Sequence, residues 1–395
     1  MIAILSVAVA ADLVVRGGTV YPVSGPPIED GAVLARDGRI VAVGPAASIQ
    51  VPPGAEMMEG AVVTPGLVDA YATVGLTGVY NTPIDQDHAE SSETVWPELR
   101  AIDAFDPWEP LVAWVRDHGV TTVMAAPSPG VPVGARSAVL HTLPAPPDET
   151  ALITDSMVVF TVGLPTKTLF PGELSSRMGT AATIRQALAE AQDAKQRRTL
   201  PLADRPERNL GDEALIELLE GKRTAVFAAE RVPDLLTALR IADEFDLRIV
   251  LAGAGEAWRI PGTIKKAGVP VIVGPVMGRS WSDDEGHDRS FANAAILAEA
   301  GIPIAFSSGY ESYVPKVRVV LWEAAIAAAN GLGRDATIEA LTLGAARILG
   351  IDDTTGSLEP GKSADFAVFD GDPFEYASHV CAVVVQGTVA SRTCQ

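Results

Sequence analysis

Basic residues are scarce in this sequence, and that scarcity limits the partners the protein can take. Its 395 residues include 50 Asp and Glu but only 30 Lys and Arg, which gives a formal net charge of −20. No cluster of Lys and Arg interrupts this excess, so the surface would repel nucleic acid and anionic membranes. The charge therefore predicts a small molecule or another protein as the partner, and argues against DNA or RNA.

Long apolar runs are also missing, and the short one that exists lies at the N-terminus. MIAILSVAVAAD combines an apolar region with Ala8-Val9-Ala10, a pattern that precedes signal cleavage before Ala11. The run is too short to span a membrane. We therefore expect residues 1–11 to be a signal segment and the protein to be exported to the periplasm or the exterior. The alternative is a buried first strand in a cytoplasmic protein.

Cysteine is rare, with only Cys381 and Cys394. The two residues flank VVVQGTVAS, which predicts a hairpin turning at Gln386-Gly387. Equal strands about that turn would place Cys381 opposite Arg392, so a single bulge would bring the two cysteines together. A disulfide fits an exported protein, and two free thiols are the alternative.

Several motifs that carry known chemistry are absent. The sequence has no G-x-S-x-G, no P-loop and no dinucleotide fingerprint. It has only five histidines, and no two of them form a His-x-His or His-x-x-x-His pair: His88, His118, His141, His287 and His379. It also has no internal repeat and no low-complexity tract, which favours a folded globular protein.

Short alternating strands are present at both ends of the chain. DLVVRGGTVY and GAVLARDGRIVAVG near the start, and SADFAVFDGDP and HVCAVVVQGTVAS near the end, are broken by turn-forming Gly, Pro and Asp. Neither end has enough apolar surface to form a domain alone. We therefore expect residues 12–62 and 353–395 to pair into one small β-sandwich.

Strands and helices alternate between these two ends. There are eight strand-like runs, from AVVTPGLVDAY to IPIAFSSG, and several are apolar throughout, as in parallel strands buried on both faces. Helical patterns such as VPDLLTALRIADEFD lie between many of them. Eight strands with intervening helices predict a (β/α)8 TIM-type barrel over residues 63–352, and therefore an α/β fold with a flanking β-sandwich.

These segments strongly resemble the amidohydrolase superfamily. GSLEPGKSADFAVFDGDP and the two N-terminal segments are similar to the pieces that build the sandwich of that family, and PGLVDA resembles the exit from its first barrel strand. LRAIDAFDPW, GVTTVMAAPSPG, SSRMG, LLTALRIADEFDLRIVL and GVPVIVGP resemble its imidazolonepropionase-related branch. The resemblance covers roughly residues 12 to 390 and implies a hydrolase of carbon–nitrogen bonds other than peptide bonds.

The resemblance also implies a centre of one or two divalent ions, zinc among them, that lowers the pKa of a bound water. In the family the first barrel strand ends in His-x-His, the fourth gives Lys or Glu, the fifth and sixth each give His, and the eighth gives Asp. None of those residue types is present at the matching positions of this sequence. The positions fall on Tyr71, Thr73, Gly163, Ala228, Gly253 and Gly309.

Because the ligand positions are substituted, we expect no metal and no cofactor. The favoured interpretation is a pseudoenzyme that binds a small molecule or a partner subunit, either a second copy or an active amidohydrolase. One alternative is a hydrolase of carbon–nitrogen bonds with a metal-free or relocated-metal mechanism. Another is a structural or surface-exposed binding module, which could be exported.

Three residues remain as candidates for acid–base chemistry: Glu230, Glu256 and His141. Glu230 ends the fifth strand and Glu256 follows the sixth, so either could point into the barrel mouth. His141 ends the third strand and would face the same mouth. Salt bridges for the two glutamates, and a hydrogen-bonded strand histidine, are the alternatives.

Two acidic loops are candidates for cation binding. IDQDHAESSE carries Asp85, Asp87, His88 and Glu90, which would hold Ca²⁺ or Zn²⁺ if their side chains converged. WSDDEGHDRS, with His287, is the second. The alternative in both cases is a solvated loop on an acidic protein. Aromatic residues of the mouth would line an apolar pocket: Tyr71, Tyr310, Trp258 and Trp281.

Overall fold

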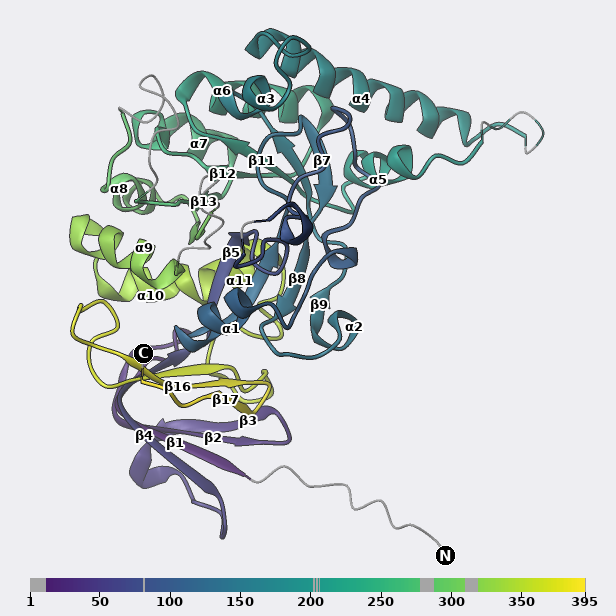
Figure 1. Ribbon diagram of the computed structural model, residues 1–395. Coiled ribbons are helices and arrows are strands. Elements are labelled where there is room, and N and C mark those ends of the chain that lie inside the picture. The colour runs from purple at the N-terminus through teal and green to yellow at the C-terminus, as the bar shows by residue number, and fades with distance from the viewer. Residues whose placement is uncertain are drawn as a thin grey trace, which may run out of the picture.

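A computed structural model describes the chain from residue 12 to residue 394 with gaps. The described residues are 12–80, 82–201, 203, 205, 207–277, 288–309 and 319–394. The expected signal segment, the acidic loop with Trp281 and His287, and Tyr310 lie outside them. Figure 1 shows an α/β part and, below it, a β-sheet to which both ends of the chain contribute.

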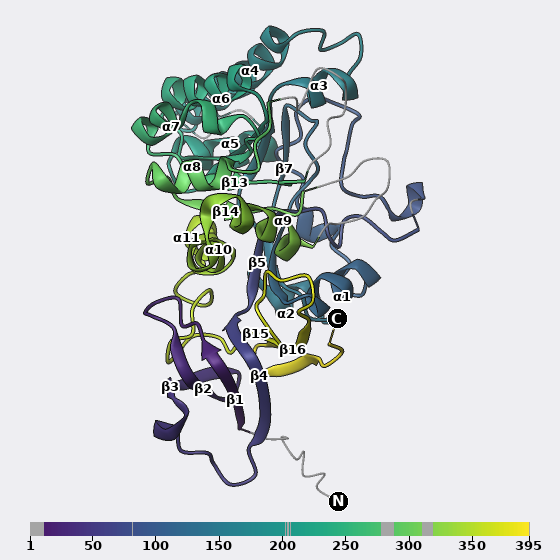
Figure 2. The same cartoon turned by 90° about the vertical axis from the view of Figure 1, so that its left-hand side faces the viewer.

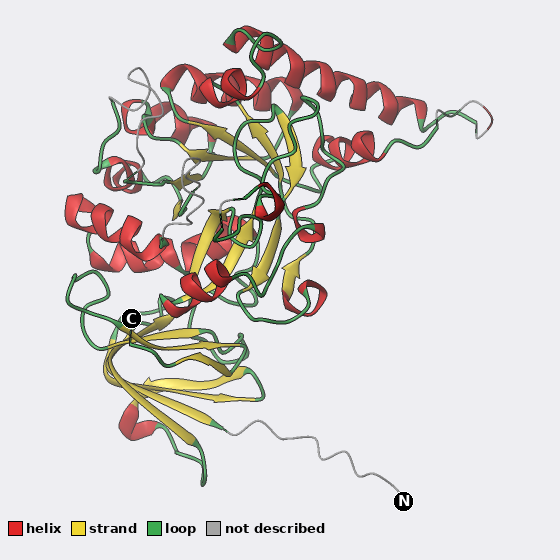
Figure 3. Cartoon of the chain, viewed as in Figure 1, coloured by secondary structure: helices red, strands yellow, loops and turns green. Residues whose placement is uncertain are grey.

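The sheet from the chain ends has seven strands in the order β17-β16-β15-β4-β1-β2-β3. They are β1 (Leu13–Val20), β2 (Ile28–Arg36), β3 (Arg39–Pro45), β4 (Glu56–Pro65), β15 (Phe366–Phe369), β16 (Val380–Val385) and β17 (Thr388–Ser391). Antiparallel pairing of β15 with β4 joins the C-terminal strands to the N-terminal ones. Strands from the two chain ends therefore lie in one continuous sheet (Figure 3), and the expected sandwich stays a prediction.

Two hairpin turns in this sheet follow directly from the sequence. Asp37 and Gly38 have φ of 49° and 76°, and Gln386 and Gly387 have φ of 50° and 73°. Two consecutive positive φ values give a turn whose twist matches that of the flanking strands. The turn predicted at Gln386-Gly387 is confirmed. The register of β16 and β17 shifts by a bulge, and Cys381 and Cys394 form a disulfide.

The α/β part contains a six-stranded sheet, in the order β14-β13-β12-β11-β10-β7, and a four-stranded sheet, β5-β6-β8-β9. Their strands are β5 (Leu67–Ala72), β6 (Val120–Ala125), β7 (Val133–Arg136), β8 (Ala138–His141), β9 (Ala151–Ile153), β10 (Val158–Thr161), β11 (Ala225–Ala229), β12 (Ile249–Gly253), β13 (Val271–Val273) and β14 (Ile304–Phe306). Each of the eight predicted runs contains a strand. The run AVVTPGLVDAY divides at Gly66, because its first half is the end of β4 in the flanking sheet.

Helices cover the outer faces of these strands (Figure 2). They are α1 (Pro110–Asp117), α2 (Pro147–Thr150), α3 (Leu164–Leu169), α4 (Arg177–Arg197), α5 (Leu210–Leu219), α6 (Val232–Phe245), α7 (Pro261–Ala267), α8 (Asn293–Glu299), α9 (Val320–Ala327), α10 (Arg334–Leu341) and α11 (Leu343–Leu349). The side chain of Ser176 accepts a hydrogen bond from the Gly179 N–H at the start of α4, which satisfies one of the unpaired amides there. No helix in the described part of the chain is long and apolar enough to cross a membrane.

The third strand of the predicted barrel runs in the opposite direction to the prediction. After β6 the chain turns straight back, so that β8 pairs antiparallel with β6, and β7 pairs antiparallel with β10. The segment 133–141 therefore passes from one sheet to the other. A parallel return needs a long crossover connection, and none lies between β6 and β7. The expectation of eight parallel strands is wrong at this strand.

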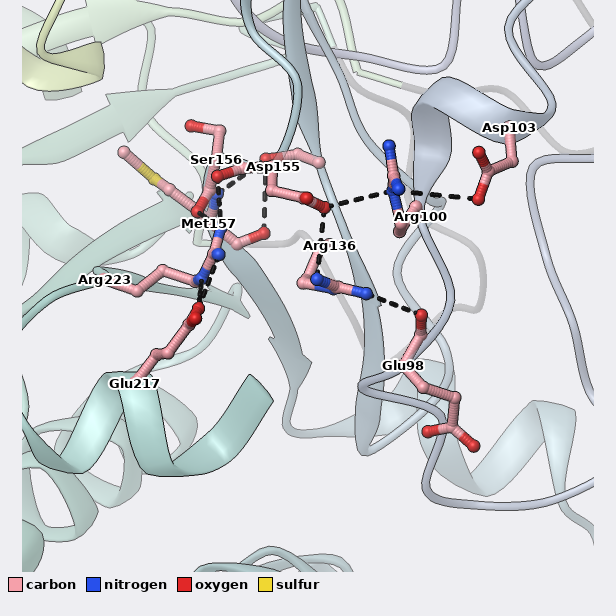
Figure 4. A network of polar contacts seen from close by, with 10 residues as sticks. Glu98, Arg100, Asp103, Arg136, Asp155, Ser156, Met157, Glu217 and Arg223 are labelled. Carbon is pink, nitrogen blue, oxygen red and sulfur yellow. Dashed lines mark hydrogen bonds and ion pairs between the residues drawn. The ribbon is translucent and has the colours of Figure 1, made fainter. Parts of the chain in front are cut away.

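A network of charged groups stabilises the junction of β7 and β10 (Figure 4). Asp155 Oδ1 lies 3.3 Å from Arg100 Nε and 3.2 Å from Arg136 Nη1. Arg223 donates to the carbonyls of Asp155 and Ser156 and also pairs with Glu217. These contacts connect the loop before α1, the strands β7 and β10, and α5. They lie where the pairing of β7 with β10 is irregular.

The first and last predicted barrel strands meet through few backbone contacts. Ala72 and Gly309 form a single β-bridge. Side chains add to it, since Ser307 Oγ donates to the Tyr71 carbonyl at 2.6 Å and the Ser308 N–H donates to Asp69 Oδ1 at 3.0 Å. The described strands thus form two open sheets joined at their edges, in a mixed α/β fold.

Candidate functional site

The six positions that match the family's metal ligands lie at the carboxyl ends of neighbouring strands. Register places Ala228 beside Thr161, and Gly253 beside Ala229. Gly309 follows β14 and bridges to Ala72 of β5, between Tyr71 and Thr73. The structure therefore brings these positions to one end of the α/β part, which is where barrel proteins keep their active sites.

Tyr71, at the first of these positions, has a buried ring. The side chain is only 3% exposed, and its hydroxyl donates a hydrogen bond to the Pro127 carbonyl at 2.5 Å. Burial raises the pKa of the Tyr71 hydroxyl well above its usual range, so the phenol is neutral at any physiological pH. Thr73 is fully buried, and its hydroxyl has no hydrogen-bond partner in the described structure.

The three glycine positions are occupied by side chains from elsewhere. A β-carbon placed on Gly163 would lie 2.6 Å from Asp234 Oδ2, and one on Gly309 would lie 2.5 Å from Pro275 Cδ. A β-carbon on Gly253 would collide with Glu230 Oε1. All three glycines also have positive φ, of 106°, 67° and 79° in that order. Space and backbone conformation therefore both oppose a ligand side chain at these positions.

Each of three carboxylates at this end is paired with an arginine. Glu230 Oε2 lies 3.0 Å from Arg289 Nη2, and Asp234 Oδ1 lies 2.7 Å from Arg177 Nε. Glu256 Oε1 lies 3.4 Å from Arg231 Nε. Its Oε2 accepts a hydrogen bond at 2.9 Å from the N–H of Val232, the first residue of α6. Glu256 thus satisfies one of the backbone N–H groups that a helix leaves unpaired at its start. The salt bridges considered as the alternative for Glu230 and Glu256 are present.

His141 lies at the other end of the strands. Because β8 runs antiparallel to β6, its last residue points toward the flanking sheet. His141 is buried, and its Nδ1 lies 3.9 Å from Oδ2 of the equally buried Asp365. The expectation that His141 faces the mouth is therefore wrong, since it assumed a parallel strand.

The polar loop after β5 does not gather its side chains around a common point. Asp85 accepts from the N–H groups of Tyr80 and Thr82, and Glu90 accepts from that of Ser92. His88 Nδ1 lies 2.8 Å from Ser128 Oγ, and burial lowers the pKa of His88 to about 4. Asp87 is exposed. Across the residues the structure describes, no three of His, Cys, Asp and Glu are grouped so that they could hold a metal ion.

Sequence reasoning missed Asp69, which it used only as part of the PGLVDA motif. Its Oδ1 accepts from the Ser308 N–H at 3.0 Å and from the Tyr71 N–H at 3.4 Å. Burial raises the pKa of Asp69 to about 7, against those hydrogen bonds, and the charge of Glu323 adds to the rise. The sequence did offer a signal for Asp69, because it is an aspartate inside an otherwise apolar strand. Asp234, which fills the space at Gly163, was also missed and had no such signal.

A small cavity remains beside the ends of β12 and β13. It has a volume of about 10 Å³, and Gly253, Gly274, Arg289, Phe291 and Asn293 are among its lining residues. A space of that size holds about one water molecule. Trp258, expected in a mouth pocket, instead donates from its indole N–H to the Asp288 carbonyl near the surface. Trp258 therefore does not line this cavity.

A zinc-type centre does not fit these residues. Zinc in proteins is held by imidazole, thiolate or carboxylate groups. The six positions offer a buried phenol, a buried hydroxyl and four residues with no donor in the side chain. The nearest carboxylates already bind arginines or backbone amides.

The strands and helices form a mixed α/β fold, and comparisons with known proteins find amidohydrolases among its structural neighbours. Residues 319–390 match the amidohydrolase family. The crystal structure of an amidohydrolase from Thermotoga maritima MSB8 superposes with a TM-score of 0.89 and 29% identity, over 96% of this chain and 100% of that one.

Two curated relatives extend the similarity. An imidazolonepropionase of Rhizorhabdus wittichii is 25% identical over 87% of this chain and 88% of its own length. The amidohydrolase tasK of Hapsidospora irregularis is 24% identical over 84% of this chain, but this chain spans only 36% of that protein. The chain therefore fits the amidohydrolase superfamily, with imidazolonepropionases and amidohydrolases among its homologues.

Proposed function

We propose that this protein is a non-catalytic member of the superfamily that binds a small molecule or a partner subunit. The observation that carries the proposal is the occupation of the ligand positions: Asp234, Glu230 and Pro275 fill the space at Gly163, Gly253 and Gly309. The loss of a single ligand would weaken a metal site, whereas here the volume for the side chains has gone as well. A hydrolytic centre of the family type needs both the ion and a water polarised by it.

Three salt bridges support the same proposal. In a metallohydrolase the ion supplies the positive charge at the strand ends. Here Arg177, Arg231 and Arg289 supply it, and each is already neutralised by one carboxylate. Each of these carboxylates already binds a guanidinium of the protein itself, so its oxygens are occupied. The arrangement therefore favours a structural role for these carboxylates over a role in acid–base catalysis.

Several further features belong to this proposal. We infer that the two open sheets correspond to the (β/α)8 barrel of the superfamily and that the seven-stranded sheet forms its flanking sandwich. A ligand of unknown identity, or a homo- or hetero-oligomer with an active relative, is the expected partner. The disulfide between Cys381 and Cys394 fits export after cleavage of residues 1–11.

The experiment that tests the proposal is the metal content of protein purified without chelators, measured by plasma mass spectrometry together with a Zn²⁺ titration. We expect far less than one equivalent of any divalent ion and no tight Zn²⁺ binding, because no donor set is assembled at the strand ends. One equivalent of tightly held Zn²⁺ or Mn²⁺ would overturn the proposal.

A second candidate is a hydrolase of carbon–nitrogen bonds with a different site. The names of the relatives favour it, as does Glu230, which remains partly exposed at the end of β11. Slow hydrolysis of cyclic amides that survives EDTA and is lost in Glu230→Gln would establish this activity. The same activity in wild type and Glu230→Gln would point to a contaminant.

A further inference from the structure

Two tryptophans on different helices form an exposed aromatic surface. Trp114 of α1 is 42% exposed, and Trp322 of α9 is 49% exposed. Their ring centroids lie 6.5 Å apart and the ring planes are inclined by 77°, which is the edge-to-face contact that aromatic rings prefer. The two side chains are therefore neighbours in the folded chain, although they are far apart in the sequence.

His118 is buried against both tryptophans and holds them in place. Its ring centroid lies 4.3 Å from that of Trp114 and 5.1 Å from that of Trp322, and the residue is only 4% exposed. Its Nδ1 donates a hydrogen bond to the Trp114 carbonyl at 2.8 Å, which fixes the imidazole against α1. A surface that is ordered in this way loses less conformational entropy when a partner binds.

The outer side of α9 extends the aromatic surface. Seven of the eight residues of this helix, VLWEAAIA, are apolar. Ala325 and Ile326 follow Trp322 by three and four positions, so they lie on the same side of the helix, and both are half-buried. A helix that is apolar on nearly every side is normally covered, whereas here Trp322 is exposed. We call Trp114, Trp322, Ala325 and Ile326 the tryptophan face.

The tryptophan face carries no charge, although the net charge of the chain is −20. The one charged residue of α9, Glu323, is fully buried, and its Oε2 accepts from the Met277 N–H at 2.7 Å. The charged residues of α1 are Arg116 and Asp117, whose charges cancel. The centres of protein interfaces are likewise depleted of charge and enriched in aromatic residues.

The charge distribution favours a second copy of this chain as the partner. A basic protein segment would find no carboxylate among the residues of the tryptophan face, so charge gives it no advantage there. Nucleic acid and anionic lipid are repelled by the chain as a whole. Two acidic copies also repel each other, and that repulsion opposes contact least at a face without charge. A two-fold contact uses the same face twice, so the exposed rings of one copy would cover those of the other.

We propose that the tryptophan face is the contact through which two copies of this chain form a two-fold dimer. Trp114 and Trp322 are of the residue type that contributes most to binding energy at protein interfaces. The dimer would also cover the outer side of α9, which a single copy leaves exposed. This inference deepens the proposed function by naming the partner subunit and the face that binds it, and it rests on that function only for the expectation of a partner.

The test measures the mass of the purified whole protein by analytical ultracentrifugation over a wide range of concentration. We expect wild type to be a dimer that dissociates on dilution. Trp114→Ser/Trp322→Ser removes both exposed rings without a change of charge and should weaken the dimer by about tenfold or more. Ala325→Glu leaves the rings in place and adds a carboxylate to the face of each copy, so it should weaken the dimer as well.

The matched control is Met178→Ser, because Met178 is 79% exposed on a different helix, at the start of α4. This variant should dimerise as wild type does, and circular dichroism checks that all the variants remain folded. Added salt screens the repulsion between the two acidic copies, so the wild-type dimer should be at least as tight at moderate salt as at low salt.

Three results would overturn the inference. A wild-type protein that is monomeric at every concentration would exclude a second copy as the partner. A dimer that is unchanged by both Trp114→Ser/Trp322→Ser and Ala325→Glu would use another face. A dimer that dissociates as salt is added would be held by ion pairs rather than by an uncharged face. None of these results depends on metal content, so the failure of this inference is distinguishable from the failure of the proposed function.

Discussion

Asp69 shows how far the environment of one residue can depart from what its motif indicates. It lies in a strand, is almost fully buried, and accepts hydrogen bonds from two backbone N–H groups. Burial raises the pKa of Asp69 to about 7 because the charged form loses its hydration. The carboxyl therefore holds a proton in the folded protein at pH values where it is ionised in the unfolded chain.

The free energy of unfolding should depend on pH through this group. The folded pKa is above the ordinary value of 3.8, so the contribution of Asp69 to stability is complete below pH 3.8 and is lost as the pH rises to about 7. We expect wild type to lose on the order of 1 kcal/mol per pH unit in this window relative to Asp69→Asn. Urea unfolding at several pH values measures the difference.

The control for this prediction is Asp148→Asn, which removes a charge from the exposed surface. It should follow the wild-type curve in parallel. If the curves of wild type and Asp69→Asn were also parallel, the carboxyl would not be titrating in that window.

Among the elements, the segment 133–141 decides the architecture. It runs antiparallel to both its neighbours, and the network around Asp155 stabilises the place where it changes sheets. Burial lowers the pKa of the Arg136 guanidinium, and the charge of Asp155 opposes that effect. The ion pair with Asp155 therefore offsets part of the free energy that burial of the Arg136 guanidinium costs.

Asp155→Asn should destabilise the protein, because it leaves Arg100 and Arg136 without their shared carboxylate. A fully buried pair broken in this way costs about 3–5 kcal/mol, and partial exposure reduces the expected loss to about 1–2 kcal/mol. Asp103→Asn is the matched control, since Asp103 is exposed and lies 3.7 Å from Arg100 Nε. Chemical denaturation of both variants measures the difference, and an equal effect would contradict a special role for Asp155.

The C-terminal hairpin offers a second prediction at this scale. The disulfide between Cys381 and Cys394 closes a loop with a sequence separation of 13. Loops of this size restrict the unfolded chain enough to stabilise the fold by about 3 kcal/mol. Reduction, or Cys381→Ser/Cys394→Ser, should lower the thermal midpoint in calorimetry. A reductant added to the double variant should change nothing, and an unchanged midpoint on reduction of wild type would oppose the prediction.

At the scale of the whole molecule, the structure resembles that of solved amidohydrolases, and side chains pack against the described strand ends. The flanking sheet ties both chain ends to the α/β part, where α1 packs against β16 and β17. Among the described residues, Tyr71 is buried there and the neighbours of the three glycines lie close against them.

The sequence alone predicted the local elements well. The strands, most of the helices and the hairpin turn at Gln386-Gly387 depend on residues close together in the chain, so pattern and turn chemistry were sufficient. The pairing of the two chain ends also followed, because neither end could bury its apolar face alone. The residue types at the six positions are read directly from the sequence, whereas their match to the family's ligand positions stays a prediction.

Only the tertiary structure decided the direction of the third strand, the place of His141 and the occupation of the glycine positions. The hydrogen bond from the Ser308 N–H to Asp69 joins residues 239 positions apart. Asp234, which lies in α6, contacts the space beside Gly163, which precedes α3. Such contacts depend on how distant segments pack, and local propensity carries no information about them. The sequence by itself determined which residue types stand at the six positions, and the fold determined which side chains surround them.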